Sequence, residues 1–265
     1  MALTKAAGLE FSPTINIELL REAGIDLSSQ YTIIPGFCDV HVHFREPGFS
    51  YKETIRSGSE AAARGGYTAV CAMPNLNPIP DSLPHLQAEL DCIRRDAQVN
   101  VCPYGSITKG EQGKTLSDME SLAPYVPGFS DDGRGVQSRA LMREAMLLAK
   151  SLRRPIVAHC EDETLLPKGW CVHDGGFARR NGLTGNPSES EWRQVARDLE
   201  LVAETGCPYH VCHVSTKESV ALVRDAKRTG LPVTCETGPH YLILCDEASP
   251  MSSCCQVRMS SHASM

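Results

Sequence analysis

The chain has 265 residues, 42% of them hydrophobic and 22% charged, which is the composition of an ordinary globular protein able to bury a sizeable core. Its formal net charge of -6 gives no reason to expect nucleic acid or a membrane as a partner. Neither a bilayer-spanning apolar stretch nor a signal-peptide core is present, so we expect a cytoplasmic protein. Its twelve cysteines are dispersed, which favours free thiols in a reducing compartment.

Short β-rich runs alternate with amphipathic helical segments along most of the chain. The predicted strands are 32–44, 67–73, 100–107, 126–130, 155–160, 209–214 and 232–236. The predicted helices are 53–64, 83–96, 138–152, 190–205 and 216–229. In the helix over 138–152, we expect the buried face to contain Leu141, Ala145, Leu148 and Leu152. This alternation predicts a parallel sheet, either as a (β/α)8 barrel or as a doubly wound sheet.

Reactive residues lie at or just after the carboxyl ends of most of the predicted strands. They are His41, His43, Asn75, Asp131, Asp132, His159, His213 and His240. In a (β/α)8 barrel, catalytic groups from many strands meet at this end, whereas a doubly wound sheet concentrates its chemistry at one switch point. The sequence also lacks a glycine-rich phosphate loop. We therefore predict an α/β fold that is an incomplete (β/α)8 barrel, with about seven of the eight strands that this architecture requires.

His41 and His43 lie two residues apart at the end of an apolar run. Because successive strand side chains alternate between faces, both imidazoles point the same way while Val42 points to the other side. Arg45 is two residues further along and shares that face if the chain stays extended. Such a pair can offer two nitrogens to one metal ion, but it is as often a pair of polar strand residues.

Two further histidines, His159 and His213, end other apolar runs. A single histidine in this position is more often a satisfied core residue than a ligand, but four at successive strand ends favour a metal centre. The acidic pair Asp131-Asp132 precedes a glycine and can be either a turn or a metal-binding carboxylate. Together these residues predict a metal site at the mouth of the barrel.

Six segments resemble the bacterial class I dihydroorotases of the amidohydrolase superfamily. They are 35–48 (PGFCDVHVHFREPG), 72–75 (AMPN), 129–133 (FSDDG), 157–162 (VAHCED), 210–217 (HVCHVSTK) and 236–240 (ETGPH). The resemblance runs in order from about residue 24 to residue 247. Jointly these motifs are specific, and the HFREPG segment points to dihydroorotases rather than to their relatives.

The resemblance implies a hydrolase with one or two Zn²⁺ ions. It places one zinc on His41 and His43 and the second position on His159 and His213, with Asp132 shared between the two. Arg45 and Asn75 match the residues that hold the substrate carboxylate, a task that suits the planar guanidinium. The implied reaction is the reversible hydrolysis of dihydroorotate to N-carbamoyl-L-aspartate in de novo pyrimidine biosynthesis.

The two ends of the chain depart from the family pattern. The family takes its catalytic aspartate from the eighth strand, and only 25 residues follow His240, so we expect that acid to be absent and assign no catalytic base. We therefore expect the catalysis of this chain to be severely weakened. We expect an atypical segment over 1–27 that lacks most of the N-terminal sandwich, a truncated barrel over 28–247 and an atypical, disordered tail over 248–265. A truncated or frame-shifted gene would produce such an end.

Two other functions stay open at this point. An allantoinase or dihydropyrimidinase is disfavoured because those enzymes usually carry a carboxylated lysine where Asp132 stands. A non-catalytic scaffold for aspartate carbamoyltransferase is disfavoured because a scaffold has no need of the four histidines. The predicted partner is a small-molecule substrate, and the choice between a homodimer and an assembly with aspartate carbamoyltransferase is left open.

Overall fold

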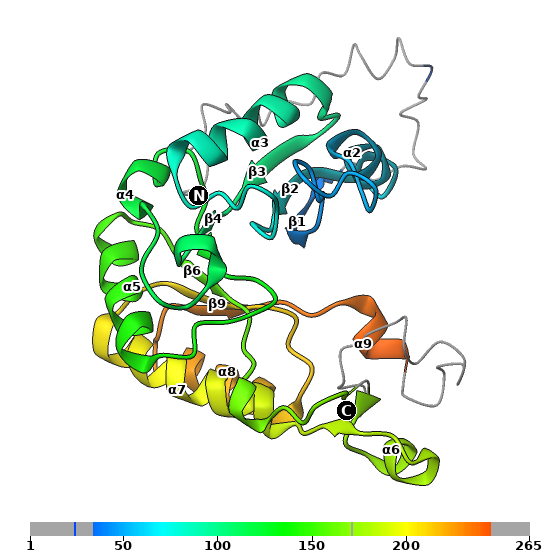
Figure 1. Ribbon diagram of the computed structural model, residues 1–265, viewed down its shortest axis with the longest axis vertical. Helices are drawn as coiled ribbons and strands as arrows, with labels where there is room; N and C mark the ends of the chain where they lie inside the picture. Colours follow the sequence, from blue (N-terminus) through cyan, green and yellow to red (C-terminus); the bar gives the residue numbers. More distant parts are fainter. Residues whose placement is uncertain (1–23, 25–33, 171, 245–265) are drawn as a thin grey trace.

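The structure is a computed structural model that describes residue 24, residues 34–170 and residues 172–244 (Figure 1). Its main strands are β1 (Phe37–Val42), β2 (Tyr67–Ala72), β3 (Asn100–Pro103), β4 (Gly105–Ser106), β5 (Phe129–Ser130), β6 (Ile156–Ala158), β9 (Tyr209–Val211) and β10 (Val233–Cys235). They coincide with all seven predicted runs, because β3 and β4 share one of them. The predicted segments 1–27 and 248–265 lie outside the described residues, apart from Gly24.

These strands form two sheets, in the orders β1-β2-β3 and β10-β9-β6-β5-β4, and every pair is parallel. Tyr104 joins the two sheets, because it is the one residue between β3 and β4. Its backbone N–H donates to Ala72 O at 2.9 Å, and the next N–H, from Gly105, donates to Gly128 O at 3.2 Å. The Tyr104 hydroxyl donates to Val40 O in β1 at 3.1 Å.

The strand order follows the chain order from β1 to β10 without a reversal. A doubly wound sheet reverses its order at a switch point, so this topology is that of a barrel, as the sequence predicts. The described part of the chain forms an arc of strands with helices along its outer side (Figure 1). In the described residues no ladder joins β10 to β1, and these two strands are the edges of the arc.

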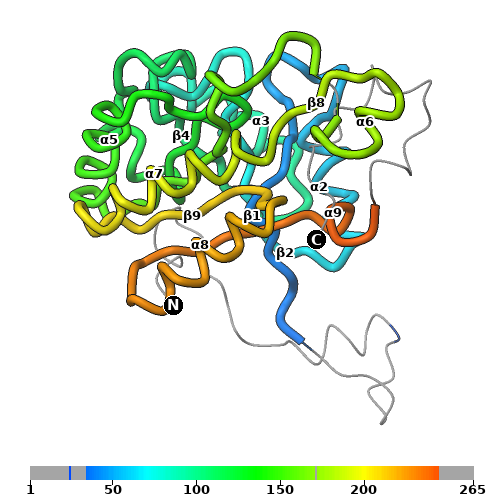
Figure 2. Tube along the Cα trace, turned by 90° about the horizontal axis from the view of Figure 1, so that it is seen from below, coloured from blue at the N-terminus to red at the C-terminus, as the bar shows by residue number. Residues whose placement is uncertain are grey.

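The outer helices are α2 (Ile55–Arg64), α3 (Leu83–Asp96), α4 (Met119–Leu122), α5 (Arg139–Ser151), α7 (Glu189–Thr205) and α8 (Lys217–Arg228). Five of them match the predicted helices to within two residues at each end. A short lobe of β7 (Val172–His173), α6 (Gly176–Asn181) and β8 (Gly185–Asn186) interrupts the alternation, and α9 (Pro239–Ile243) follows β10 (Figure 2). Among the described residues, no helix has the length and apolarity needed to cross a membrane.

The buried face of α5 differs in part from the predicted one. Met142, Ala145, Met146 and Ala149 are at most 1% exposed. Leu141, Leu148 and Leu152 lie at the margin of this face, where they are partly buried against the core. The prediction was wrong about the centre of the face because it followed the leucines, whereas the two flexible methionines fill the space over the sheet.

Two apolar cores of unequal size lie behind the two sheets. The five-stranded sheet packs against α5, α7 and α8 through a large cluster that includes the fully buried Phe129 and Ile156. The three-stranded sheet has a small cluster of five buried residues, which are Phe44, Ile55, Val70, Ala72 and Val101. Helix α3 contacts both, because Leu86 belongs to the large cluster and Ile93 packs against the small one.

Candidate metal centre

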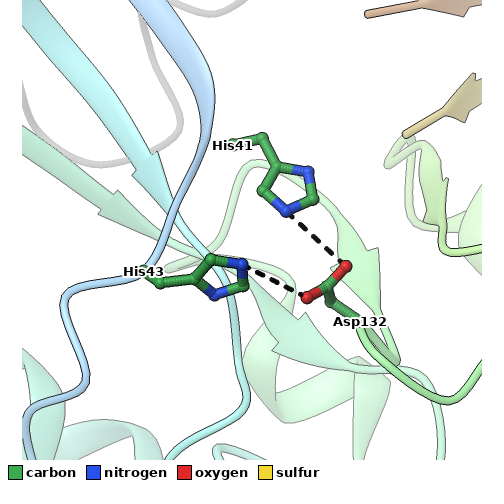
Figure 3. Close-up of side chains that lie close together, drawn as sticks. All are labelled: His41, His43 and Asp132. Carbon is green, nitrogen blue, oxygen red and sulfur yellow. Dashed lines mark ion pairs between the residues drawn. The ribbon is translucent and has the colours of Figure 1, made fainter. Parts of the chain in front are cut away.

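Two imidazoles from the end of β1 face one carboxylate from the end of β5 (Figure 3). His41 Nε2 lies 3.6 Å from Asp132 Oδ1, and His43 Nε2 lies 3.6 Å from Asp132 Oδ2. The two rings are on the same side of the strand, as the alternation of strand side chains predicts. The carboxylate therefore offers one oxygen to each ring.

Two more imidazoles approach the same carboxylate from the ends of β6 and β9. His159 Nδ1 lies 3.7 Å from Asp132 Oδ1, and His213 Nε2 lies 3.5 Å from the same oxygen. The His159 Nδ1 and His213 Nε2 atoms are 3.0 Å apart. All five residues for which the sequence predicts metal binding are thus brought together, from four different strands.

The spacing of these atoms fits a cation better than it fits hydrogen bonds. Asp132 Oδ1 is buried and has no hydrogen-bond partner among the described residues. Nitrogen–oxygen distances of 3.5–3.7 Å exceed the usual hydrogen-bond range. Two ligand atoms that each lie about 2.1 Å from a tetrahedral ion are about 3.4 Å apart. The donor set forms two groups that share Asp132, one with His41 and His43 and one with His159 and His213.

The electrostatics of the centre favour an ionised carboxylate. Burial by itself raises the pKa of Asp132, but its contacts with His159 and His213 hold that pKa well below its ordinary value. Burial lowers the pKa of His43 to about 4, so this ring is neutral near pH 7. Burial also opposes the charge of His159, but Asp132 and Glu161 raise its pKa to about 9. A metal at the second position must therefore displace a proton from His159.

The neighbouring acid, Asp131, has a different environment. Its Oδ1 accepts hydrogen bonds from the backbone N–H groups of Ile107 at 2.7 Å and Thr108 at 3.0 Å, and its Oδ2 accepts from the Thr108 hydroxyl. Burial raises the pKa of Asp131 to about 6 despite these bonds. Asp131 therefore fastens the loop after β4 to β5, and Asp132 alone of the pair faces the histidines.

Arg45 and Asn75, which are predicted to hold substrate, lie beside the centre. The Asn75 amide donates to Asp132 Oδ2 at 3.0 Å, and its oxygen lies 3.1 Å from His43 Nδ1. Arg45 Nη1 donates to Asn75 O at 3.3 Å. Arg45 has a φ of 45°, which is a strained left-handed backbone conformation for a residue other than glycine.

Glu236, which directly follows β10, is a residue of the centre that the sequence analysis missed. Its Oε1 lies 3.2 Å from His41 Nδ1, and its Oε2 lies 2.7 Å from His210 Nε2. Burial opposes its charge, but the contacts with His210 and His41 lower the pKa of Glu236 to about 2. Its place at a strand end is the signal that could have identified it, because the same signal identifies the histidines.

A cavity of about 530 Å³ opens beside the centre, on the side where β1 and β10 are unpaired. Three histidines of the metal centre and the segment after β10 contribute to its lining. Its lining consists of Cys38, Asp39, Val40, His41, His43, Tyr67, His213, Glu236, Thr237, Gly238, Pro239, His240 and Tyr241. A volume of this size is typical of sites for small molecules.

An arc of parallel strands whose carboxyl ends gather four histidines and an aspartate defines an α/β barrel of the amidohydrolase type. The model of the dihydro-orotase-like family matches residues 31–219. The chain therefore belongs to the dihydro-orotase-like family, as the sequence motifs predict.

Curated relatives agree with this assignment. A dihydroorotase from Fusobacterium nucleatum is 51% identical over 232 residues, which is 88% of this chain and 54% of that protein. A dihydroorotase from Anoxybacillus flavithermus is 54% identical over 227 residues, which is 85% of this chain and 53% of that protein. The chain thus spans about half the length of these relatives.

Solved structures share the barrel fold. The L-hydantoinase (dihydropyrimidinase) from Arthrobacter aurescens superposes with a TM-score of 0.67 at 23% identity, over 80% of this chain and 49% of that one. The D-hydantoinase (dihydropyrimidinase) from Thermus sp. superposes with a TM-score of 0.60 at 26% identity, over 79% of this chain and 48% of that one. These likenesses bear out the predicted barrel class.

Proposed function

We propose that this chain carries the zinc centre and the substrate-carboxylate contacts of a dihydroorotase, which hydrolyses the cyclic amide of dihydroorotate reversibly to N-carbamoyl-L-aspartate. The observation that carries the proposal is the Asp132 carboxylate, with four imidazoles close around it, in a chain about half identical to curated dihydroorotases. We propose that this reaction serves pyrimidine biosynthesis in the cytoplasm.

Zinc is the metal that this donor set suits, because it accepts imidazole nitrogen and carboxylate oxygen in a tetrahedral arrangement. His41, His43 and Asp132 would hold one ion, and Asp132, His159 and His213 would hold a second. When bound, zinc lowers the pKa of water and polarises a carbonyl, which is the activation that amide hydrolysis requires. The low pKa of Asp132 keeps the shared ligand ionised throughout the neutral range.

Arg45 and Asn75 would hold the substrate carboxylate next to the zinc. A guanidinium has five N–H donors in a planar fork, so its bond to Asn75 O leaves donors that match the two oxygens of a carboxylate. Asn75 bonds Asp132 Oδ2, so a substrate held by these two residues has its amide close to the shared ligand. The strained backbone of Arg45 supports this role, because strain of this kind collects at functional sites.

Metal analysis and a substrate panel test the proposal. We expect the purified chain to retain one or two zinc ions and to leave dihydrouracil and allantoin unchanged. It should interconvert dihydroorotate and N-carbamoyl-L-aspartate only when zinc is present, and slowly, because no catalytic base is assigned to it. His41→Ala should lose both zinc and turnover. A chain that retains no zinc, or that prefers dihydrouracil or allantoin, would contradict the proposal. Size-exclusion chromatography with and without aspartate carbamoyltransferase separates a homodimer from a mixed assembly.

A further inference from the structure

The carboxylate of Glu236 lies where three strands of the barrel approach one another. Its Oε1 faces His41 Nδ1 of β1 at 3.2 Å and also accepts from the backbone N–H of His213 after β9. Its Oε2 faces His210 Nε2 of β9 at 2.7 Å, and Glu236 itself follows β10. In the described residues β10 and β1 share no ladder, so this one side chain spans the two unpaired edges.

The two nitrogens of His41 face opposite partners. Nε2 points at Asp132 Oδ1, and Nδ1 is buried 3.2 Å from Glu236 Oε1, an ion-pair contact that is not a well-formed hydrogen bond. An ionised carboxylate only accepts hydrogen bonds, so the hydrogen of a neutral His41 belongs on Nδ1. Nε2 then keeps its lone pair for a metal.

Two further contacts fix Glu236 itself. His210 is anchored on its far side, where Nδ1 lies 2.7 Å from Thr234 Oγ1. The His213 N–H that Glu236 accepts belongs to a residue with a φ of 35°, a strained conformation that the carboxylate helps to hold. Glu236 is therefore placed by β9 and β10 and acts on the histidine of β1.

We propose that Glu236 is a positioning residue of the metal centre, which holds the Nδ1 hydrogen of His41 and thereby presents Nε2 to the ion. The inference rests on the proposed function for the presence of zinc, and it adds a residue that sets the tautomer and the orientation of one ligand. His43 shows the same arrangement with a different acceptor, because its Nδ1 faces Asn75 Oδ1 while its Nε2 faces Asp132. Residues that hydrogen-bond a metal ligand without touching the metal typically contribute 10- to 100-fold to metal affinity.

The test compares Glu236→Ala and Glu236→Gln with a matched control, Glu218→Ala, which removes an exposed carboxylate from α8. Nitrogen-15 NMR of histidine-labelled protein gives the position of the ring hydrogen of His41 in the metal-free chain at a pH where the ring is neutral. Competition with a chromogenic chelator gives the zinc affinity. Circular dichroism reports whether each variant is folded.

We expect the hydrogen of His41 on Nδ1 in the wild-type chain and a mixture of tautomers in Glu236→Ala, with zinc affinity about 10- to 100-fold lower. Glu236→Gln should restore the Nδ1 hydrogen, because an amide oxygen also accepts, and should recover part of the affinity. Glu218→Ala should match the wild type in both measurements.

Two results would overturn the inference. One is a wild-type His41 that carries its hydrogen on Nε2, which can be read even if Glu236→Ala does not fold. The other is a folded Glu236→Ala variant with wild-type tautomer and zinc affinity. If the wild-type chain binds no zinc, the proposed function fails, and the tautomer measurement still decides the role of Glu236.

Discussion

The two sheets of the barrel differ in the size of the apolar core that supports them. The five-stranded sheet lies against three long helices and a large apolar cluster, whereas the three-stranded sheet has five buried residues behind it. His41 and His43 come from the small sheet, and Asp132, His159 and His213 come from the large one. The candidate metal centre therefore lies across the junction of the two sheets, and its geometry depends on how they are held together.

Polar side chains supply many of the contacts that cross this junction. Asn75, after β2, bonds Asp132, after β5, and Glu236, after β10, faces His41 in β1. A bound cation would add ligands from both sheets to this set. We infer that metal binding stabilises the small sheet more than the large one, because the large sheet has its own core.

The largest expected effect comes from removing the carboxylate that both metal positions share. Asp132→Asn keeps the shape of the side chain but removes its charge, and we expect zinc affinity to fall by at least about 100-fold, beyond the usual effect of an outer partner. Chelator competition measures the change. Asp225→Asn, on the exposed end of α8, is the matched control. Unchanged zinc affinity in Asp132→Asn would remove this residue from the centre.

Truncating one buried isoleucine behind each sheet tests the stability of the two sheets separately. Ile55 and Ile156 are both fully buried, the first in the small cluster and the second in the large one. We expect each change to alanine to cost about 2–5 kcal/mol. Hydrogen exchange followed by mass spectrometry should show faster exchange in β1 and β2 alone for Ile55→Ala, with zinc restoring protection. Ile156→Ala should speed exchange in both sheets, and equal patterns in the two variants would contradict the comparison.

Glu89, on the helix that contacts both clusters, should make stability depend on pH. It is 1% exposed, its carboxyl oxygens have no hydrogen-bond partner among the described residues, and burial raises its pKa well above 4.5. Because its folded pKa is raised, the contribution of Glu89 to stability is greatest below pH 4.5 and declines as pH rises from there through the folded pKa.

Glu89→Gln removes this titration. The variant should match the wild type at pH 4 and be more stable by about 1–3 kcal/mol at pH 8, because a neutral side chain costs less to bury. Urea unfolding at the two pH values measures the difference. If the difference in free energy of unfolding between the wild type and the variant is the same at both pH values, Glu89 does not titrate as its burial implies.

The smallest effect is expected on the outer surface of the well-packed sheet. Arg143 of α5 and Glu204 of α7 form an exposed ion pair. Arg143→Ala should change the free energy of unfolding by about 1 kcal/mol or less and should leave zinc affinity unchanged. Thermal unfolding and chelator competition check both points. A larger loss of stability would show that this ion pair contributes more than exposed pairs usually do.

The sequence predicted the strands and the five main helices well, because apolar runs, helical spacing and glycine stops are local signals. The sequence also predicted that the five metal-site residues lie close together, since the carboxyl ends of parallel strands meet at one end of a barrel. The lobe around α6 was missed because its strands have two residues each and no hydrophobic period. The positive φ values of Arg45 and His213 and the role of Glu236 depend on contacts across strands, which spacing along the chain does not reveal.

Tyr104 lies at the corner between β3 and β4, where the two sheets of the barrel meet. Its N–H donates to Ala72 O in β2, the N–H of the next residue donates to Gly128 O just before β5, and its hydroxyl donates to Val40 O, one residue before the first histidine. This corner thus connects β1, β2 and the start of the large sheet through hydrogen bonds. A shift at this corner would therefore move β1, and with it His41 and His43, relative to the large sheet that carries the other three ligands.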